Sequence, residues 1–131
     1  MGCAVLDASA AVWLLLDPGH RGEEVAATLA NHTLAAPALL PCEVANVIRR
    51  RCLAGLIAEG QGRLAVAGLM ELAVDLWPWE AVAEQVWHMR ESITAYDASY
   101  VALARLVDAP LVTADTALAQ VAGRWCTVTA V

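Results

Sequence analysis

Short apolar runs alternate with longer stretches of helical periodicity along the whole chain. The short runs end in polar or turn residues and predict buried strands, whereas the longer stretches predict helices. Strands are expected over residues 3–6, 34–36, 75–79, 111–115 and 125–131. Helices are expected over residues 10–16, 23–30, 38–54, 61–74, 81–89, 97–109 and 116–122. This alternation predicts a single α/β domain whose parallel sheet is covered by helices on both faces.

The stretch over residues 94–115 carries the strongest signal. Its helix is apolar on nearly every side, with Arg105 as the one polar residue between Val101 and Val107, and this composition predicts burial. At about 100° per residue, Asp97 lies in line with Val101 on the inward side. An isolated buried charge is very costly, so this carboxylate needs a partner. No cation lies on that line nearby in the sequence, and we therefore expect a metal ion shared with other acids.

Four acids stand at element boundaries or on helix faces beside apolar residues, namely Asp7, Glu43, Asp97 and Asp115. Two of them, Asp7 and Asp115, follow expected strands, and the carboxyl ends of parallel strands commonly form sites. Two carboxylates ~6 Å apart repel by roughly 3 kcal/mol at an effective dielectric constant of 20. Convergence of all four therefore requires a divalent cation. A ligand set of oxygens without His or Cys indicates Mg²⁺ or Mn²⁺.

Each of these acids also has an ordinary structural interpretation. Asp7 could simply end a strand, and Glu43 could be solvated on a helix face. Asp97 lies three residues after Thr94, which is the spacing of a capping box. Asp115 could be only the N-cap of the next helix. The combination of the four acids, in this order and context, favours a functional site.

The charge of the chain limits how it can bind nucleic acid. The net charge is −6, and the sequence contains Arg but no Lys. Such a protein does not bind RNA through bulk charge, so it needs a local Arg cluster or a bridging cation. Glu43, Asn46 and Arg50 share a strip about 60° wide on the long helix. Arg50 is therefore a candidate phosphate contact, unless residues 49–51 form a solvated helix end favoured by the helix dipole.

The cysteines and the apolar runs bear on the location of the protein. The four cysteines lack the spacing of a zinc site, which predicts reduced core residues of a cytoplasmic protein. The longest uncharged run, residues 25–42, contains two prolines and polar residues, so no membrane span is expected. The start of the chain also lacks the pattern of a signal peptide. A cytoplasmic protein is the expectation.

Four motifs together resemble the PIN-domain ribonucleases, most closely the VapC toxins of bacterial toxin–antitoxin systems. They are VLDASA at residues 5–10, PCEVANVIRR at 41–50, YDASYVALA at 96–104 and LVTAD at 111–115. They span nearly the whole chain in the order of the family. The resemblance implies a PIN-like three-layer α/β/α sandwich with a mainly parallel central sheet, formed as one domain by residues 1–131.

The resemblance also implies the activity and the residues that carry it. Asp7, Glu43, Asp97 and Asp115 match the catalytic, metal-binding acids, and Ser9 and Thr113 match small polar positions beside them. Asn46, which shares a helical strip with Glu43, is a further supporting candidate. The implied activity is Mg²⁺- or Mn²⁺-dependent hydrolysis of RNA phosphodiester bonds. The alternative is a catalytically inactive PIN-fold interaction module. A receiver-type phosphotransfer domain, which also places Asp at strand ends, relies on a Lys that this chain lacks.

The implied partners are an RNA substrate, a cognate antitoxin and a second copy of the chain. The expected helix over residues 10–16, capped by Ser9, is apolar all round. It either packs against the core on both sides or leaves surface for a partner. Trp77, Trp79 and Trp87 add aromatic surface of unknown use, and core packing is the ordinary expectation for them.

Overall fold

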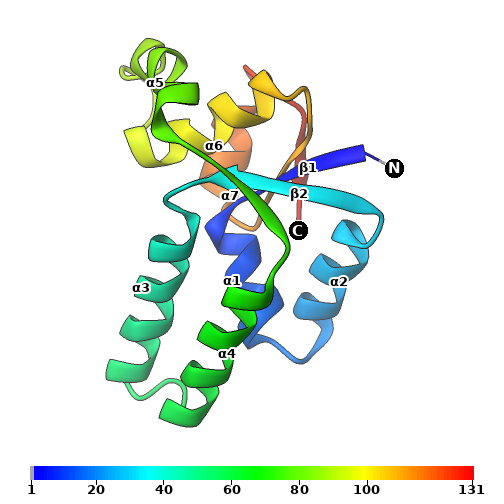
Figure 1. Cartoon of the computed structure of the whole chain (residues 1–131), viewed down its shortest axis with the longest axis vertical. Coiled ribbons are helices and arrows are strands. Elements are labelled where there is room, and N and C mark those ends of the chain that lie inside the picture. Colours follow the sequence, from blue (N-terminus) through cyan, green and yellow to red (C-terminus); the bar gives the residue numbers. More distant parts are fainter. Residues whose placement is uncertain (1) are drawn as a thin grey trace.

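A five-stranded sheet forms the middle of the structure (Figure 1). The computed structural model describes residues 2–131. The strands are β1 (Gly2–Leu6), β2 (His32–Pro37), β3 (Val74–Trp77), β4 (Leu111–Thr113) and β5 (Val128–Ala130). Their order is β3-β2-β1-β4-β5, and every neighbouring pair is parallel. The predicted parallel sheet is confirmed, and β3 lies at an edge, as the proline after it suggests.

Helices cover both faces of this sheet. They are α1 (Ala8–Leu16), α2 (His20–Leu29), α3 (Leu40–Leu53), α4 (Glu59–Glu71), α5 (Trp79–His88), α6 (Ala95–Leu106) and α7 (Thr116–Ala122). In Figure 1, α1 to α4 lie below the sheet, and α5 and α6 lie above it. This is the expected three-layer α/β/α arrangement. Among residues 2–131, no helix combines the length and the apolar character that crossing a membrane requires.

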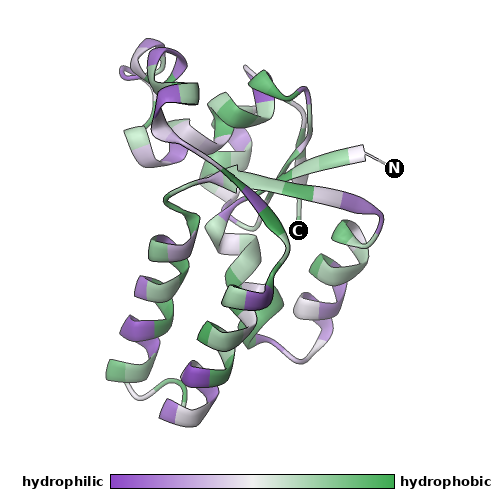
Figure 2. Ribbon diagram, in the orientation of Figure 1, coloured by the Kyte–Doolittle hydropathy of each residue, from purple (hydrophilic) through white to green (hydrophobic). Residues whose placement is uncertain are grey.

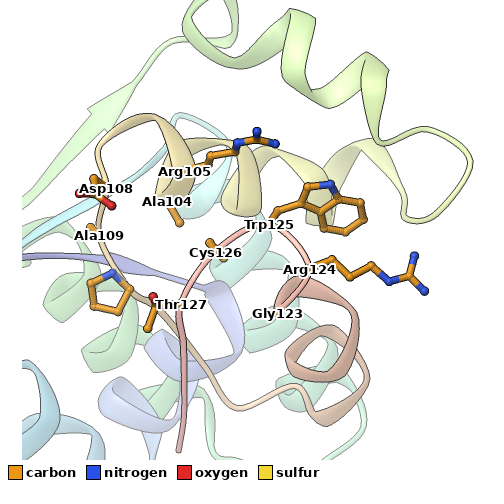
Figure 3. Close-up of a pocket in the computed structure, with 10 residues that line it drawn as sticks. Ala104, Arg105, Asp108, Ala109, Gly123, Arg124, Trp125, Cys126 and Thr127 are labelled. Carbon is orange, nitrogen blue, oxygen red and sulfur yellow. The ribbon is translucent and has the colours of Figure 1, made fainter.

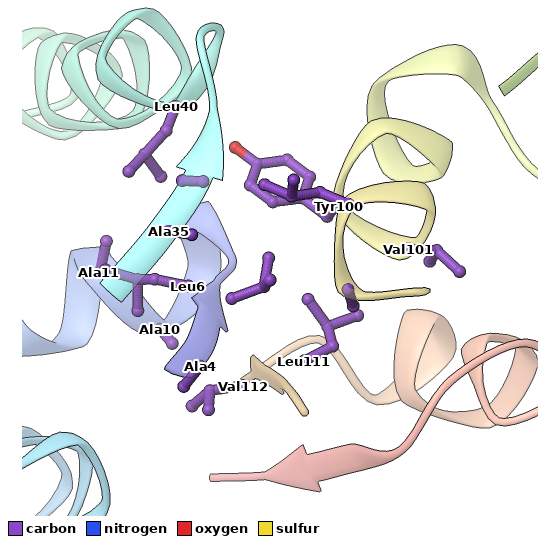
Figure 4. Close-up of a cluster of buried hydrophobic side chains, with 14 of the residues drawn as sticks. Ala4, Leu6, Ala10, Ala11, Ala35, Leu40, Tyr100, Val101, Leu111 and Val112 are labelled. Atoms are coloured by element: carbon purple, nitrogen blue, oxygen red, sulfur yellow. The ribbon is translucent and has the colours of Figure 1, made fainter. Parts of the chain in front are cut away.

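The core lies where the central strands meet α1 and α6. In β1, Ala4, Val5 and Leu6 have no exposed surface, and α6 is buried continuously from Ala98 to Ala104. Figure 4 shows side chains from both layers converging here, and Figure 2 shows the hydrophobic residues running along β1 and β2. The predicted burial of this helix is confirmed, and Arg105 lies on its exposed side.

The apolar first helix packs on all sides, so it leaves little surface for a partner. Its residues are all buried or half-buried, and α2, α3 and α4 contact it. Its return into α2 is tight, because a Cβ on Gly22 would lie 1.9 Å from the carbonyl oxygen of Asp17. The Asp17 carboxylate accepts hydrogen bonds from the backbone N–H groups of Gly19 and Gly22, which lower its pKa. Core packing was the correct alternative for this helix.

Several expected boundaries differ from the observed ones. Ser9 is not a cap, because α1 begins at Ala8 and Asp7 occupies the N-cap position. The last helix before β4 ends at Leu106, since Asp108 takes a left-handed φ of 52°. The strand expected over residues 111–115 ends at Thr113, because Asp115 starts the next helix.

Helix α3 ends at a glycine in the left-handed conformation. Gly55 has a φ of +73°. Its N–H donates a hydrogen bond to the carbonyl of Cys52, and the N–H of Leu56 donates one to the carbonyl of Arg51. These two bonds form the Schellman motif that a glycine favours. The cysteines are all free, but Cys42 is exposed on α3 and is therefore not the core residue that was expected.

Candidate active site

Asp7 is the most buried of the four acids. It follows β1 directly and is only 5% exposed. Its Oδ2 accepts hydrogen bonds from the hydroxyls of Ser9 (2.5 Å) and Thr113 (2.8 Å). Its backbone N–H donates to Val112 in the neighbouring strand at 3.0 Å. Both side-chain bonds reach Oδ2, so within residues 2–131 the second oxygen is left for another ligand.

The two hydroxyls are themselves fixed by the backbone. Ser9 Oγ accepts a hydrogen bond from the N–H of Ala114 (2.9 Å), and Thr113 Oγ1 accepts one from the N–H of Asp115 (3.1 Å). Each hydroxyl has a single proton, and both protons are directed at Asp7. The 3.2 Å approach between the two hydroxyl oxygens is then a contact without a proton between them. The structure thus places two of the three expected supporting residues, Ser9 and Thr113, on Asp7 and ties them to the loop that carries Asp115.

Glu43 lies half-buried in the first turn of α3. The hydroxyl of Tyr100, a residue of α6, donates a 2.7 Å hydrogen bond to its Oε1. In Figure 4 this hydroxyl points out of the apolar cluster toward the end of β2. Tyr100 is 1% exposed, and burial together with Glu43 raises the pKa of its phenol far above the usual value. Tyr100 therefore remains a protonated donor that fixes the orientation of Glu43.

Sequence analysis did not single out Tyr100. It occupies a position on the inward side of α6, where an aromatic residue ordinarily counts as core. The available signal was its hydroxyl, since a buried Tyr O–H needs a hydrogen-bond partner. It also follows Asp97 by three residues, which places both on neighbouring parts of one helical face.

Asp97 lies in the first turn of α6 and is half-buried. The expected capping contact exists, because Thr94 Oγ1 accepts a 3.2 Å hydrogen bond from the backbone N–H of Asp97. That bond uses the main chain of Asp97. Within the part of the chain that the structure describes, the carboxylate of Asp97 makes no hydrogen bond. The side chain is therefore available to a ligand while the helix is still capped.

Asp115 does cap a helix, as its structural interpretation predicts. Its Oδ1 accepts hydrogen bonds from the N–H groups of Ala117 (3.0 Å) and Leu118 (3.1 Å) at the start of α7. The residue is exposed, and the helix N-terminus favours its negative charge. Capping occupies Oδ1 and holds the carboxylate in one orientation, so Oδ2 can serve a second purpose.

The four carboxylates are coupled through their charges. Burial raises the pKa of Glu43, the Tyr100 hydrogen bond opposes this, and the charges of Asp7 and Asp97 raise the pKa further. Burial also raises the pKa of Asp97, with additional contributions from Asp7 and Asp115. All four acids therefore belong to one electrostatic group at the carboxyl edge of the sheet.

In this structure the four acids do not surround a common point as a complete set of metal ligands would. Among residues 2–131, no three His, Cys, Asp or Glu side chains are arranged around a common point as metal ligands. The donor chemistry nevertheless fits a hard divalent cation, because the donors are oxygens and the pocket carries excess negative charge. A cation would offset the repulsion that raises the pKa values of Glu43 and Asp97.

The remaining candidate residues, Asn46 and Arg50, lie beside the acidic site or outside it. A hollow of about 360 Å³ is lined by Leu39, Cys42, Glu43, Asn46 and Tyr96. Asn46 thus reaches the entrance beside Glu43. Arg50 is exposed one turn further along α3 and does not line this hollow.

A larger hollow, about 540 Å³, lies elsewhere (Figure 3). Arg105, Arg124 and Trp125 line it, together with Pro110 and Thr127, which immediately precede β4 and β5. It therefore opens at the amino ends of these strands, opposite the acids. In parallel α/β sheets, sites form at the carboxyl ends. Position and chemistry together identify the acidic edge as the candidate active site.

Coupled carboxylates at the carboxyl edge of a parallel α/β sandwich form the kind of acidic site at which a hydrolase can hold a divalent cation. The PIN domain model matches residues 4–124, and the chain belongs to the PIN domain family, among its VapC ribonucleases. It is 37% identical to VapC ribonuclease Mb0985 of Mycobacterium bovis over 127 residues, 97% of each chain. It is 39% identical to ribonuclease VapC12 of Mycobacterium tuberculosis over 116 residues, 88% of this chain and 89% of that one.

A solved structure shows the same fold. The crystal structure of VapBC2 from Rickettsia felis, bound to a DNA fragment from their promoter, superposes with a TM-score of 0.66. The match has 12% sequence identity and covers 99% of this chain and 98% of that one. The family model and the relatives confirm the resemblance drawn from the four motifs, and the solved structure confirms the α/β/α fold.

Proposed function

We propose that this endoribonuclease hydrolyses RNA at the four-acid site with the help of Mg²⁺ or Mn²⁺. The ribonuclease class follows from its family membership. The observation that supports the site is Asp7, a buried carboxylate that is fixed by two hydroxyls and whose charge raises the pKa values of Glu43 and Asp97. A buried acid with this arrangement is more than the end of a strand, because two hydroxyls that are anchored to the backbone hold its side chain in one orientation.

The proposed role of each residue follows from the contacts that its side chain makes. Asp7 and Asp97 are the first candidates for direct metal ligands, since Asp7 is buried and fixed by two hydroxyls, and the Asp97 carboxylate makes no hydrogen bond among residues 2–131. Tyr100 is a positioning residue that orients Glu43, and the cap of α7 orients Asp115. These two acids complete the ligand set or align water molecules. When bound, the ion neutralises charge on a phosphoryl oxygen and lowers the pKa of a coordinated water.

The experiment that tests this proposal is cleavage of RNA by the purified protein with Mg²⁺ and in excess chelator. We expect cleavage only with the metal present. A catalytically inactive PIN-fold module would leave the RNA intact under both conditions, and this result would overturn the proposal. Cleavage that persists in chelator would contradict metal dependence.

Arg50 is proposed as a contact to an RNA phosphate outside the immediate site. It lies on α3 one turn beyond Asn46 and is exposed to solvent. We expect Arg50→Ala to weaken RNA binding severalfold and to make the slope of log K against log salt shallower by about 0.7 for each phosphate that Arg50 neutralises. The measurement is fluorescence anisotropy at several salt concentrations. An unchanged slope would assign Arg50 to the solvated helix end.

A cognate antitoxin is proposed to occupy an apolar groove beside β3, which would make this protein the toxin of a pair. The groove, about 380 Å³, is lined by Leu40, Pro41, Leu69, Met70, Leu72, Val74 and Leu76. Met70 is 83% exposed, and β3 is an edge strand of the sheet. The structural neighbour from Rickettsia felis is a VapBC2 structure.

We also propose that this protein acts in the cytoplasm, because its substrate is RNA.

A homodimer is also proposed. Exposed Leu53 and Leu56, at the turn between α3 and α4, supply apolar surface for a second copy. Sedimentation velocity at micromolar concentration should show a species of twice the chain mass. A strictly monomeric protein would contradict the dimer but leave the site unaffected.

A further inference from the structure

Three exposed aromatic side chains lie on the flank of the acidic site, outside the machinery described above. Tyr96 is 67% exposed, Trp79 52% and Trp87 66%. Arg90 accompanies them, with its guanidinium carbon 4.7 Å from the ring centre of Trp87. We call these four residues, Tyr96, Trp79, Trp87 and Arg90, the aromatic track. Core packing, the ordinary expectation for tryptophan, does not apply to the two exposed indoles.

The aromatic track is continuous with the acidic site. Its first hollow is the one that Tyr96 lines together with Glu43 and Asn46. The next hollow, about 340 Å³, shares Leu39 with the first and is bounded by Trp79. The third, about 370 Å³, shares Trp79 with the second and extends along Trp87 and Arg90. Three hollows of similar size, each bounded by an aromatic ring, thus lead away from the acids.

Arg90 and Trp87 form one structural unit. The guanidinium covers one part of the indole and also donates a 3.0 Å hydrogen bond to the backbone carbonyl of Trp87. This anchoring holds a positive charge beside an exposed ring. A base that stacks on the remaining indole surface would place its phosphate within reach of Arg90. A cation next to a stacking platform is the combination by which proteins hold single-stranded nucleic acid.

We propose that the aromatic track binds an unpaired segment of the RNA substrate by base stacking and leads it to the acidic site. The inference rests on the proposed function, because it assigns the occupant of a surface next to that site. It also resolves how a chain of net charge −6 can hold a polyanion. Exposed acids such as Glu80, Glu84 and Glu91 lie on or next to α5, so affinity here must come from stacking. Base–aromatic stacking does not depend on net positive charge.

Two consequences follow for the substrate. Bases in a duplex are already stacked and paired, so the track should select single strands, loops or bulges over double-stranded RNA. Binding should also depend only weakly on salt, since few phosphates are neutralised by basic side chains. The track is tolerant of sequence, because every base has a face that can stack.

The test measures binding of a short fluorescein-labelled single-stranded RNA of mixed sequence, in the non-cleaving Asp7→Asn background with Mg²⁺ present. We expect Trp87→Ala and Trp79→Ala each to weaken binding about tenfold with an unchanged salt slope. Trp87→Phe, which keeps a stacking ring, should restore most of the affinity. The same RNA annealed to its complement should bind at least tenfold more weakly than the single strand. Leu106→Ala, at the other end of α6, is the matched control and should bind as the parent does.

Several outcomes would overturn the aromatic track. Unchanged single-strand affinity in both Trp→Ala variants would do so, even if the wild-type enzyme cleaves RNA with Mg²⁺, and this separates its failure from that of the proposed function. Equal loss of affinity in Trp87→Phe and Trp87→Ala would argue against stacking. A variant that dissociates a dimer in sedimentation without changing RNA affinity would assign the surface to protein contact. Melting curves of each variant exclude unfolding as the cause.

Discussion

Replacing Asp7 by Asn is expected to reduce Mg²⁺-dependent RNA cleavage by at least about 10³-fold. A direct metal ligand supports charge stabilisation worth several kcal/mol, and roughly 4 kcal/mol corresponds to this factor. The fold should survive, because the amide oxygen of Asn can accept the hydrogen bonds that Ser9 and Thr113 donate to Asp7. The NH₂ group of Asn then replaces Oδ1, the carboxylate oxygen that is left for the metal ion in Asp7. Single-turnover cleavage and a melting curve measure the two effects.

Asp108→Asn is the matched control for this experiment. It removes the same charge at the opposite edge of the sheet, where Asp108 lines the hollow of Figure 3. Asn tolerates the left-handed φ of 52° found there. The control should cleave RNA as the wild type does. Full activity in Asp7→Asn would refute the assignment of the site.

Asp97→Asn is expected to have opposite effects on activity and on stability. Cleavage of RNA should fall. The metal-free protein should become more stable at neutral pH, because the substitution removes one negative charge from a group of carboxylates that repel one another. The group is half exposed, so solvent screens the repulsion. A rise in melting temperature on the order of 2–5 °C is expected in chelator.

The pH dependence of this gain follows from the pKa of Asp97. Burial and the charges of Asp7 and Asp115 raise the pKa in the folded protein above the unfolded value. The folded state therefore binds the proton more tightly, and ionisation of Asp97 destabilises it. This penalty is absent below the unfolded pKa and fully present above the raised folded pKa. The advantage of Asp97→Asn should grow as the pH rises through that interval and then level off.

Thermal melts of both proteins in chelator, from acidic to neutral pH, measure this difference. Addition of Mn²⁺ should reverse the order of stability, because only the wild type keeps the full ligand set. Asp108→Asn should show neither effect. Equal stability of Asp97→Asn and wild type at neutral pH in chelator would mean that Asp97 is not part of a repelling group.

The sequence predicts those features that depend on local pattern. The order of strands and helices follows from the spacing of apolar residues, and the burial of α6 follows from its composition. Thr94 caps α6 because its hydroxyl suits the N-cap position. Errors arise where two local solutions compete, as at Ser9, which is free to hold Asp7 because Asp7 itself occupies the N-cap position.

Features that depend on contacts between distant residues were not accessible from local pattern. Tyr100 and Glu43 are 57 positions apart, and only the packing of α6 against the carboxyl edge of the sheet brings them together. The exposure of Trp79 and Trp87 has the same origin, because it depends on which face of α5 packs on α6. Motif spacing identified the acids, but not the hydroxyl that orients one of them.

The central claim is that Asp7, Glu43, Asp97 and Asp115 serve one divalent cation. Its most direct test is anomalous diffraction from crystals of the protein grown with Mn²⁺. We predict a peak about 2.1–2.2 Å from carboxylate oxygens of Asp7 and Asp97, with Glu43 and Asp115 bound to it directly or through its water molecules. Well-diffracting crystals with these carboxylates ordered and no manganese among them would contradict the account.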